Sequence, residues 1–296
     1  MTHALGMHPM NAQVLKYAAF TDDGTGGNPA GVVLDSDRLT DQQMLAIAAA
    51  IGYSETAFVS ADGRRLRFFS PRAEVAFCGH ATVATAVALA ERDGTGTRDL
   101  VTAAGRISVE TRTTGRGLEA TLTSPPASTR EASAELVAET LAAFAWESAL
   151  LDPAFPVHVA NAGNDHLMLG LAGLETLAAF DYDYDALAAL MEREGWTTVH
   201  AFVRERPTEF RARNAFPPGG VREDPATGAA AAAFGGYLRE LGLVARPSRF
   251  TIHQGVEMGA PSRIEVGVPG SGEHIEVSGA ATRLALSPYD ELEWSR

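Results

Sequence analysis

The sequence lacks a second cysteine and is poor in positive charge. Cys78 is the only cysteine among 296 residues, which excludes an intrachain disulfide and a structural zinc site built on several cysteines. Only 24 lysines and arginines face 37 acidic residues, for a net charge of −13. A chain this acidic repels nucleic-acid backbones and anionic membranes. The densest basic run, which contains Arg64, Arg65, Arg67 and Arg72, fits exposed positions of a hairpin, so we expect no nucleic-acid partner.

Long apolar runs are also missing. No stretch reaches the roughly 18 apolar residues of a membrane span, and the first ten residues do not combine a basic start with an apolar run. We therefore expect no membrane partner and a cytoplasmic location. Hydrophobic residues form 46% of the chain, which is enough to bury a core, and the length suits two lobes of about 100 to 150 residues each.

Signatures of bound cofactors are absent from the sequence. The glycine-rich run at 24–31 has neither the GxGxxG spacing nor the GKS ending of phosphate loops. His158, His166, His253 and His274 are scattered without metal-ligand spacing, and each is interpreted as a strand residue. The sequence therefore predicts an activity that needs neither a metal nor an organic cofactor.

Short apolar runs recur along the whole chain and predict many strands. They begin at Val14, Glu55, Leu66, Ile107, Gly117, Pro156, His166, Arg249, Arg263 and His274. Helical patterns are fewer, over 40–51, 81–92, 132–144, 184–194 and 229–241; Thr40 and Gln43 have the spacing of a capping box. Because strands and helices do not alternate strictly, we expect an α+β fold with antiparallel pairing.

Two segments repeat one plan. The stretches that begin at Phe68 and Arg211 both run from a strand through a glycine-containing turn into an alanine-rich helix. This predicts a duplicated protein with one buried helix per lobe, beginning near His80 and Thr227. We place the boundary at Ser128, which gives an N-terminal lobe over 1–127, completed by about 281–296, and a C-terminal lobe over 128–280.

The two helix starts carry the candidate chemistry. They read Cys78-Gly79-His80 in the first unit and Asp224-Pro225-Ala226-Thr227-Gly228 in the second. Free backbone N–H groups at a helix N-terminus bind anions, so two such starts facing one cleft would hold a small carboxylate and stabilise enolate-like charge.

Glu55, His80 and Asp224 are the candidate acid–base residues, and each has a simpler interpretation. Asp224 fits a helix N-cap, His80 fits a first-turn residue pointing into solvent, and Glu55 fits a surface glutamate at the start of a strand. A carboxylate beside the apolar run that follows Glu55 is costly unless it is paired or exposed. The local sequence leaves both interpretations open.

Five motifs in order resemble the PhzF-like family of phenazine biosynthesis. They span most of the chain: GGNPAGVVLD (26–35), SETAFV (54–59), FSPRAEVAFCGHAT (69–82), EDPATGAAAAAFGGYL (223–238) and HQGVEMGAPSRIEV (253–266). The resemblance implies a diaminopimelate epimerase-like fold, in which two pseudo-symmetric lobes each wrap a mostly antiparallel, barrel-like sheet round a central helix, with the active site between them. It also implies a homodimer that needs no cofactor.

The resemblance implies roles for nine residues. Glu55, His80 and Asp224 match the acid–base residues of an isomerase that moves a proton on a small carboxylate substrate. The residues that match substrate-binding positions are Asn28, Ser54, Cys78, Gly79, Thr227 and Gly228.

Three departures keep alternatives open. Ala229 replaces a common serine, and Ala260 stands where the family often has arginine, so the substrate is not determined. Cys78 matches a catalytic cysteine of related epimerases, whereas Pro225 replaces its partner. A racemase, epimerase or dehydratase that uses Cys78, and a binding protein without catalysis, remain the alternatives.

Overall fold

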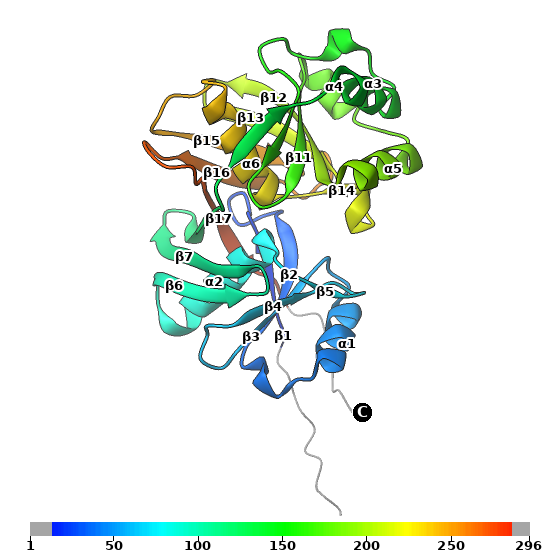
Figure 1. The fold of residues 1–296 in the computed structure, drawn as a ribbon. Coiled ribbons are helices and arrows are strands. Elements are labelled where there is room, and N and C mark those ends of the chain that lie inside the picture. The colour runs from blue at the N-terminus through cyan, green and yellow to red at the C-terminus, as the bar shows by residue number, and fades with distance from the viewer. Residues whose placement is uncertain (1–13, 286–296) are drawn as a thin grey trace, which may run out of the picture.

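The computed structural model describes residues 14–285 and has two lobes (Figure 1). The N-terminal lobe holds the first eight strands: β1 (Val14–Ala19), β2 (Asn28–Val33), β3 (Thr56–Val59), β4 (Leu66–Phe69), β5 (Glu74–Val75), β6 (Gly96–Thr102), β7 (Gly105–Thr114) and β8 (Gly117–Thr123). Its helices are α1 (Asp41–Ile51) and α2 (Gly79–Asp93), with a short 3-10 turn over Ser36–Arg38.

The C-terminal lobe contains the next eight strands. Its strands are β9 (Ser128–Glu131), β10 (His158–Asn161), β11 (Asp165–Gly170), β12 (Trp196–Arg206), β13 (Glu209–Ala215), β14 (Glu223–Asp224), β15 (Ser248–Gln254) and β16 (Ser262–Val268). Its helices are α3 (Ala134–Ala143), α4 (Leu174–Ala178), α5 (Tyr184–Glu194) and α6 (Gly228–Glu240), with 3-10 turns over Ser148–Leu150 and Pro217–Gly219. The last strand, β17 (Glu276–Arg283), runs from this lobe into the first.

The fold is α+β with a mostly antiparallel sheet, as the sequence predicts. Only β2–β3, β11–β12 and β13–β15 are parallel among the paired strands of the described residues. The hairpin over β7 and β8 and the pairing of β4 with β5 are antiparallel, also as expected. The membership of 286–296 in the first lobe lies outside the described residues.

Each lobe encloses one buried helix, which confirms that prediction. In α2 every residue from His80 to Ala90 is buried, and the helix packs on β1, β2, β3, β7, β8 and β17. In α6 most residues from Gly228 to Leu238 are buried, and the helix packs on β9, β10, β11, β16 and β17. Alanine and glycine dominate both helices, and such small side chains let strands approach a helix from several sides.

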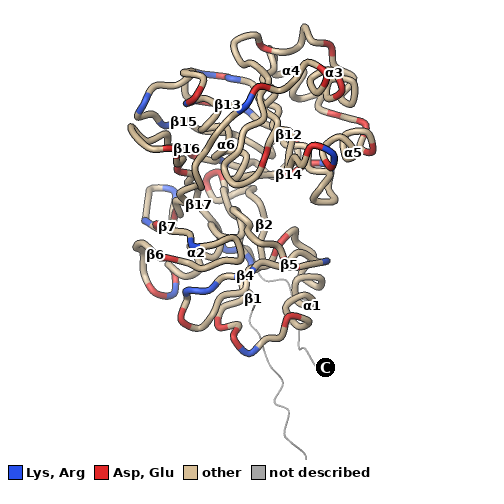
Figure 2. The backbone as a smooth tube through the Cα atoms, viewed as in Figure 1, with Lys and Arg blue, Asp and Glu red and all other residues tan. Residues whose placement is uncertain are grey.

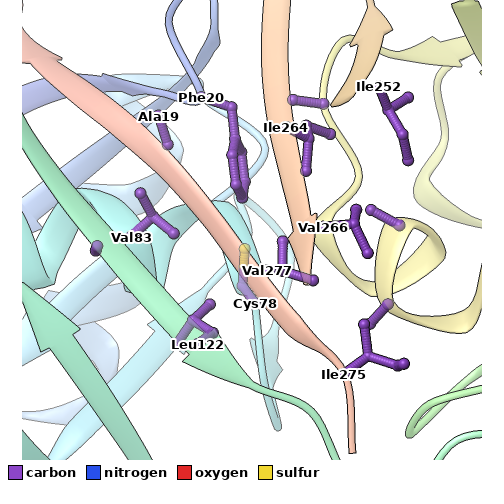
Figure 3. Close-up of a cluster of buried hydrophobic side chains, with 14 of the residues drawn as sticks. Ala19, Phe20, Cys78, Val83, Leu122, Ile252, Ile264, Val266, Ile275 and Val277 are labelled. Carbon is purple, nitrogen blue, oxygen red and sulfur yellow. The ribbon is translucent and has the colours of Figure 1, made fainter. Parts of the chain in front are cut away.

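Strand β17 joins the lobes. It pairs antiparallel with β16 of the C-terminal lobe and with β8 and β1 of the N-terminal lobe. The largest apolar cluster accordingly contains residues of both lobes, and Figure 3 shows Phe20, Cys78, Val277 and Ile264 within it. The two helix starts are therefore held by one continuous core.

Gly279 in β17 permits this close packing, and we expect Gly279→Ala to destabilise the protein. An added Cβ would lie 2.3 Å from Cδ1 of Phe20, whose side chain is fully buried. Overpacking of this kind costs about 1 to 3 kcal/mol of unfolding free energy, measurable by denaturant titration. Gly115→Ala is the matched control, because nothing lies within 4 Å of its Cβ position. Equal stability of the two variants would contradict the packing argument.

Charged residues are dispersed over both lobes. In the view of Figure 2 lysines and arginines alternate with acidic residues on outer strands and loops. Arg67, from the basic run, forms ion pairs with Asp41 and Glu74. Within 14–285 no helix is both long and apolar enough to cross a membrane.

Candidate active site

Glu55 stands directly before β3 rather than in it. The chain leaves α1 at Gly52, whose left-handed backbone ends the helix, and the carbonyl of Glu55 accepts a hydrogen bond from the N–H of Gly31. This bond fixes the residue to the edge of β2. The side chain is 17% exposed, so Glu55 is neither a free surface residue nor fully sealed from water.

His80 points inward, so the interpretation of a solvent-facing ring is wrong. It is the second residue of α2 and only 7% exposed. Its Nε2 lies 3.4 Å from Oε2 of Glu55 and 3.3 Å from the hydroxyl of Ser54. A carboxylate, an imidazole and a hydroxyl therefore meet at the start of α2.

Cys78 is the N-cap residue of α2 and completes this group. Its thiol donates a hydrogen bond to Oε2 of Glu55 at 3.6 Å, and its Sγ lies 3.3 Å from Nδ1 of His80. Burial, followed by the nearby charge of Glu55, raises the pKa of Cys78 well above its ordinary value. The sulfur is therefore a neutral thiol at neutral pH, which disfavours a role as a free thiolate base.

Asp224 lies in β14, so its interpretation as a helix N-cap is wrong. The N-cap of α6 is Thr227, whose hydroxyl donates to Oδ2 of Asp224 at 2.6 Å. Asn28 donates to Oδ1 at 2.8 Å. Burial raises the pKa of Asp224 to about 6, the charge of Glu55 acts in the same direction, and His80, Thr227 and Asn28 oppose the rise. Asp224 is therefore close enough to Glu55 and His80 to respond to their charges.

Gln254 is the residue that sequence reasoning missed. It is fully buried at the end of β15, and its amide donates to the carbonyl of Asp224 at 2.6 Å and to the Thr227 hydroxyl at 3.1 Å. Its carbonyl accepts from the N–H of Thr227 at 3.3 Å. A polar side chain beside a glycine at the end of the apolar strand 249–253 was the available signal. Gln254 fixes the turn that carries Asp224.

The two helix starts face each other. A Cβ built on Gly79 would lie 3.9 Å from Cα of Gly228, so the first turns of α2 and α6 are in van der Waals range. The N–H groups of a first turn have no acceptor within their own helix, and the helix dipole makes that end partly positive. The structure thus brings together all nine residues chosen from the sequence, in a group around Glu55 and a group around Asp224.

Comparisons with known proteins identify the family. The sequence model of the family described as phenazine biosynthesis-like protein (PhzC-PhzF) matches residues 17–286. An uncharacterised isomerase of Deinococcus radiodurans is 36% identical over 269 residues, covering 88% of this chain and 87% of the relative. A trans-2,3-dihydro-3-hydroxyanthranilate isomerase of Pseudomonas aeruginosa is 31% identical over 275 residues, covering 90% of this chain and 95% of the relative.

Solved structures show the same fold. A PhzF-family protein of Bacillus anthracis superposes with a TM-score of 0.82 at 24% identity, covering 92% of this chain and 98% of that one. A hydroxyproline epimerase of Agrobacterium vitis gives a TM-score of 0.61 at 14% identity, covering 92% of this chain and 91% of that one. Both likenesses concern the fold alone.

Proposed function

The chain is an isomerase of the phenazine biosynthesis-like family, and we propose that it moves a proton on a small carboxylate-bearing metabolite by general acid–base catalysis at Glu55. The observation that carries the proposal is the position of Glu55. Its Oε2 lies 3.4 Å from His80 Nε2 beside the start of α2, which faces the start of α6. A partly exposed carboxylate there has access to water and to a bound substrate.

The first step is proton abstraction. The carboxylate of Glu55 takes a proton from a carbon activated by the substrate's carboxyl or carbonyl group, and the resulting acid returns it to another carbon. One residue serves as base and then as acid, so no redox or metal chemistry is required. We propose that His80 and Asp224 orient polar groups of the substrate or relay a proton between its heteroatoms.

The second element is anion binding. We propose that the substrate carboxylate binds where the first-turn N–H groups of α2 and α6 converge, next to Gly79 and Gly228, with Asn28, Ser54, Cys78 and Thr227 lining the same place. Helix N-termini attract anions through free donors and partial positive charge. The same donors stabilise the negative charge that develops on the substrate as the proton leaves.

The architecture supports this assignment. We propose that the lobes over 1–127 and 128–280 are pseudo-symmetric, each with a barrel-like sheet around its helix, and that the protein forms a homodimer and acts without a cofactor. The proposal is supported by the two buried helices, since each lobe supplies one of the two helix starts that meet at one place.

The substrate test uses the reaction of the named relative first. We expect conversion of trans-2,3-dihydro-3-hydroxyanthranilate, or of another small unsaturated carboxylate in a panel, into an isomer without added metal or nucleotide. Nuclear magnetic resonance in deuterated water identifies the carbon that gains hydrogen. Conversion that stops with a chelator and resumes with one metal would overturn the cofactor-independent mechanism.

An amino-acid racemase or epimerase that uses Cys78 is the second candidate, because the sulfur lies 3.6 Å from Glu55 within the same group. The raised pKa of the Cys78 thiol and the proline at 225 oppose it. Loss of a general acid–base residue typically lowers turnover by at least about 10²-fold. We expect Cys78→Ser to lower turnover by far less than that. Loss of turnover in Cys78→Ser with activity kept in Glu55→Gln would establish the epimerase instead.

A further inference from the structure

Glu55, Cys78 and His80 together offer the donor set of a zinc site. Their potential ligand atoms all lie within 4.8 Å of one another. A borderline-soft cation such as Zn²⁺ takes thiolate sulfur, imidazole nitrogen and carboxylate oxygen, and catalytic or open sites commonly use three protein ligands. The set is not visible as a sequence motif, because 23 residues separate Glu55 from Cys78.

The geometry of the three atoms is close to one face of a tetrahedron. Oε2 of Glu55 lies 3.6 Å from Sγ of Cys78 and 3.4 Å from Nε2 of His80, and Sγ lies 3.8 Å from Nε2. A tetrahedral zinc ion with bonds of about 2.3 Å to sulfur and about 2.0 Å to nitrogen and oxygen separates its ligand atoms by about 3.3 to 3.6 Å. Each of the three separations is within a few tenths of an ångström of those values. Sγ lies nearer to Nδ1 of His80, at 3.3 Å, so the imidazole ring must also turn for Nε2 to point at an ion between the three atoms.

Charge also favours a cation at this place. The thiol and carboxylate of Cys78 and Glu55 neutralise Zn²⁺ once the thiol loses its proton, and the nearby Asp224 carboxylate adds negative potential. Burial first, and then the same negative charges, raise the pKa of the Cys78 thiol and keep it protonated when no cation is bound. Glu55 is 17% exposed and gives an incoming ion its first contact, whereas the other two side chains are more deeply buried.

We propose that Zn²⁺ binds to Oε2 of Glu55, Sγ of Cys78 and Nε2 of His80 and thereby inhibits the enzyme. Binding forms three bonds to the metal, and the Cys78 thiol releases its proton to solvent. The fourth position is left to water or to an anion. The bound carboxylate cannot accept a proton from substrate, so occupancy and turnover exclude each other. The inhibitory part of the proposal rests on the proposed role of Glu55, whereas the binding part does not.

Binding is tested on the full-length, untagged, reduced chain after removal of metals by dialysis. Calorimetric titration with Zn²⁺ should give one site per chain and proton release at neutral pH, and Mg²⁺ should give no binding. Co²⁺ in place of Zn²⁺ should produce a thiolate-to-cobalt charge-transfer band and the visible bands of tetrahedral cobalt. Absence of a stoichiometric site, or binding without the thiolate band, overturns the proposal.

Variants locate the site. Cys78→Ser, Glu55→Gln and His80→Gln should each weaken Zn²⁺ binding by more than about 10-fold, and Cys78→Ser should abolish the thiolate band. His274→Gln, at an exposed histidine, and the His3→Gln/His8→Gln double variant should bind like the wild type. Equal affinity of the wild type and the three site variants overturns the assignment, and circular dichroism of each variant excludes misfolding as the cause.

Inhibition is measured separately, with any substrate that the enzyme converts. Zn²⁺ should displace bound Co²⁺ and remove its thiolate-to-cobalt band. Turnover should be abolished at the Zn²⁺ concentration at which this displacement is complete, and a chelator should restore turnover. If the metal binds with the expected spectrum but turnover continues, the binding site stands, and both the inhibition and the proposed role of Glu55 are wrong. If turnover falls without the thiolate spectrum, the zinc site itself is wrong.

Discussion

Glu55→Gln should reduce turnover by about 10² to 10⁴-fold, near the upper end of that range, and leave folding and ligand binding close to intact. Glutamine keeps the size of glutamate and one carbonyl acceptor, so the contacts of residue 55 with His80 and Cys78 can persist. It cannot accept a proton and return it. Because the proposed mechanism uses one residue in both half-reactions, the change removes both steps.

The control for this experiment is Glu110→Gln. Glu110 is an exposed glutamate of β7, far in sequence from the site. Its replacement should leave turnover unchanged and should alter the free energy of unfolding by no more than about 0.5 kcal/mol. Turnover, thermal melting and ligand affinity are measured on the same samples. If Glu55→Gln keeps more than about a tenth of the wild-type rate, Glu55 is not the acid–base residue and Cys78 is the next candidate.

Helices with strong local signals could be predicted almost to the residue. The capping box of Thr40 and Gln43 forms as expected, and α1 ends before Gly52 in the left-handed conformation. The range predicted for α5 also matches, because Asp183 caps its start and Gly195 ends it. Such caps act within a few residues, so the chain's local sequence is sufficient to place them.

Several strands escaped prediction because their patterns depend on distant partners. β2 contains Pro29, an uncommon strand residue, and was noticed only as a motif. β12 combines apolar and charged residues without clean alternation, because it is buried for most of its length and exposed only at its end. His274, expected within a strand, precedes β17. Long-range pairing decided these elements, and no local window contains that information.

In the site, too, the local sequence indicates which residues take part, whereas long-range packing determines how their side chains lie. Residue types and motif order selected Glu55, His80 and Asp224, but the orientation of each side chain follows from packing between lobes. His80 is buried because α2 is enclosed by strands, and Asp224 is held by Asn28, which is 196 residues away in the chain. Gln254 lies in a recognised motif, yet its contact with Thr227 needed the fold to become visible.

Acid should destabilise the protein strongly between pH 6.5 and pH 4, because two histidines are buried in neutral form. His166 in β11 and His200 in β12 are fully buried. Nδ1 of His166 lies 2.8 Å from the Thr198 hydroxyl, and Nδ1 of His200 lies 2.6 Å from the Asn214 carbonyl. Within the described residues, Nε2 of each ring is buried without a hydrogen-bond partner. A second proton on either ring would therefore be poorly accommodated.

The direction follows from the pKa values. Burial lowers the pKa of His166 to about 3, with His200 adding to the effect and Asp165 opposing it, and burial lowers the pKa of His200 to about 4. In the unfolded chain both titrate near about 6.5. Below that pH the unfolded state binds protons that the folded state does not bind. The contribution of the two histidines to stability is therefore constant above about pH 6.5 and falls as the pH decreases.

The two histidines together lower the free energy of unfolding by about 4 kcal/mol at pH 5, since each contributes about 1.4 kcal/mol per pH unit below 6.5. Asp224 acts in the opposite direction. Its pKa is raised to about 6, so the folded state binds its proton before the unfolded state does as the pH falls. This stabilises the folded state by about 1 kcal/mol at pH 5 and offsets part of the histidine effect. Denaturant titrations from pH 7.5 to pH 4.5 measure the profile. The net loss between pH 7 and pH 5 should be about 3 kcal/mol.

Replacement of one buried histidine isolates its share of the profile. His200→Gln keeps a polar side chain near Asn214 but cannot titrate, so stability should fall by about 2 kcal/mol less than in the wild type between pH 7 and pH 5. His274→Gln, at an exposed histidine, should leave the profile unchanged. A wild-type profile that is flat from pH 7 to pH 5, or parallel profiles for the wild type and His200→Gln, would show that the buried rings accept protons in the folded state. The core around α6 would then have to supply an acceptor or admit water beside Phe202 and Phe234, whose rings lie 5.8 and 5.0 Å from that of His200.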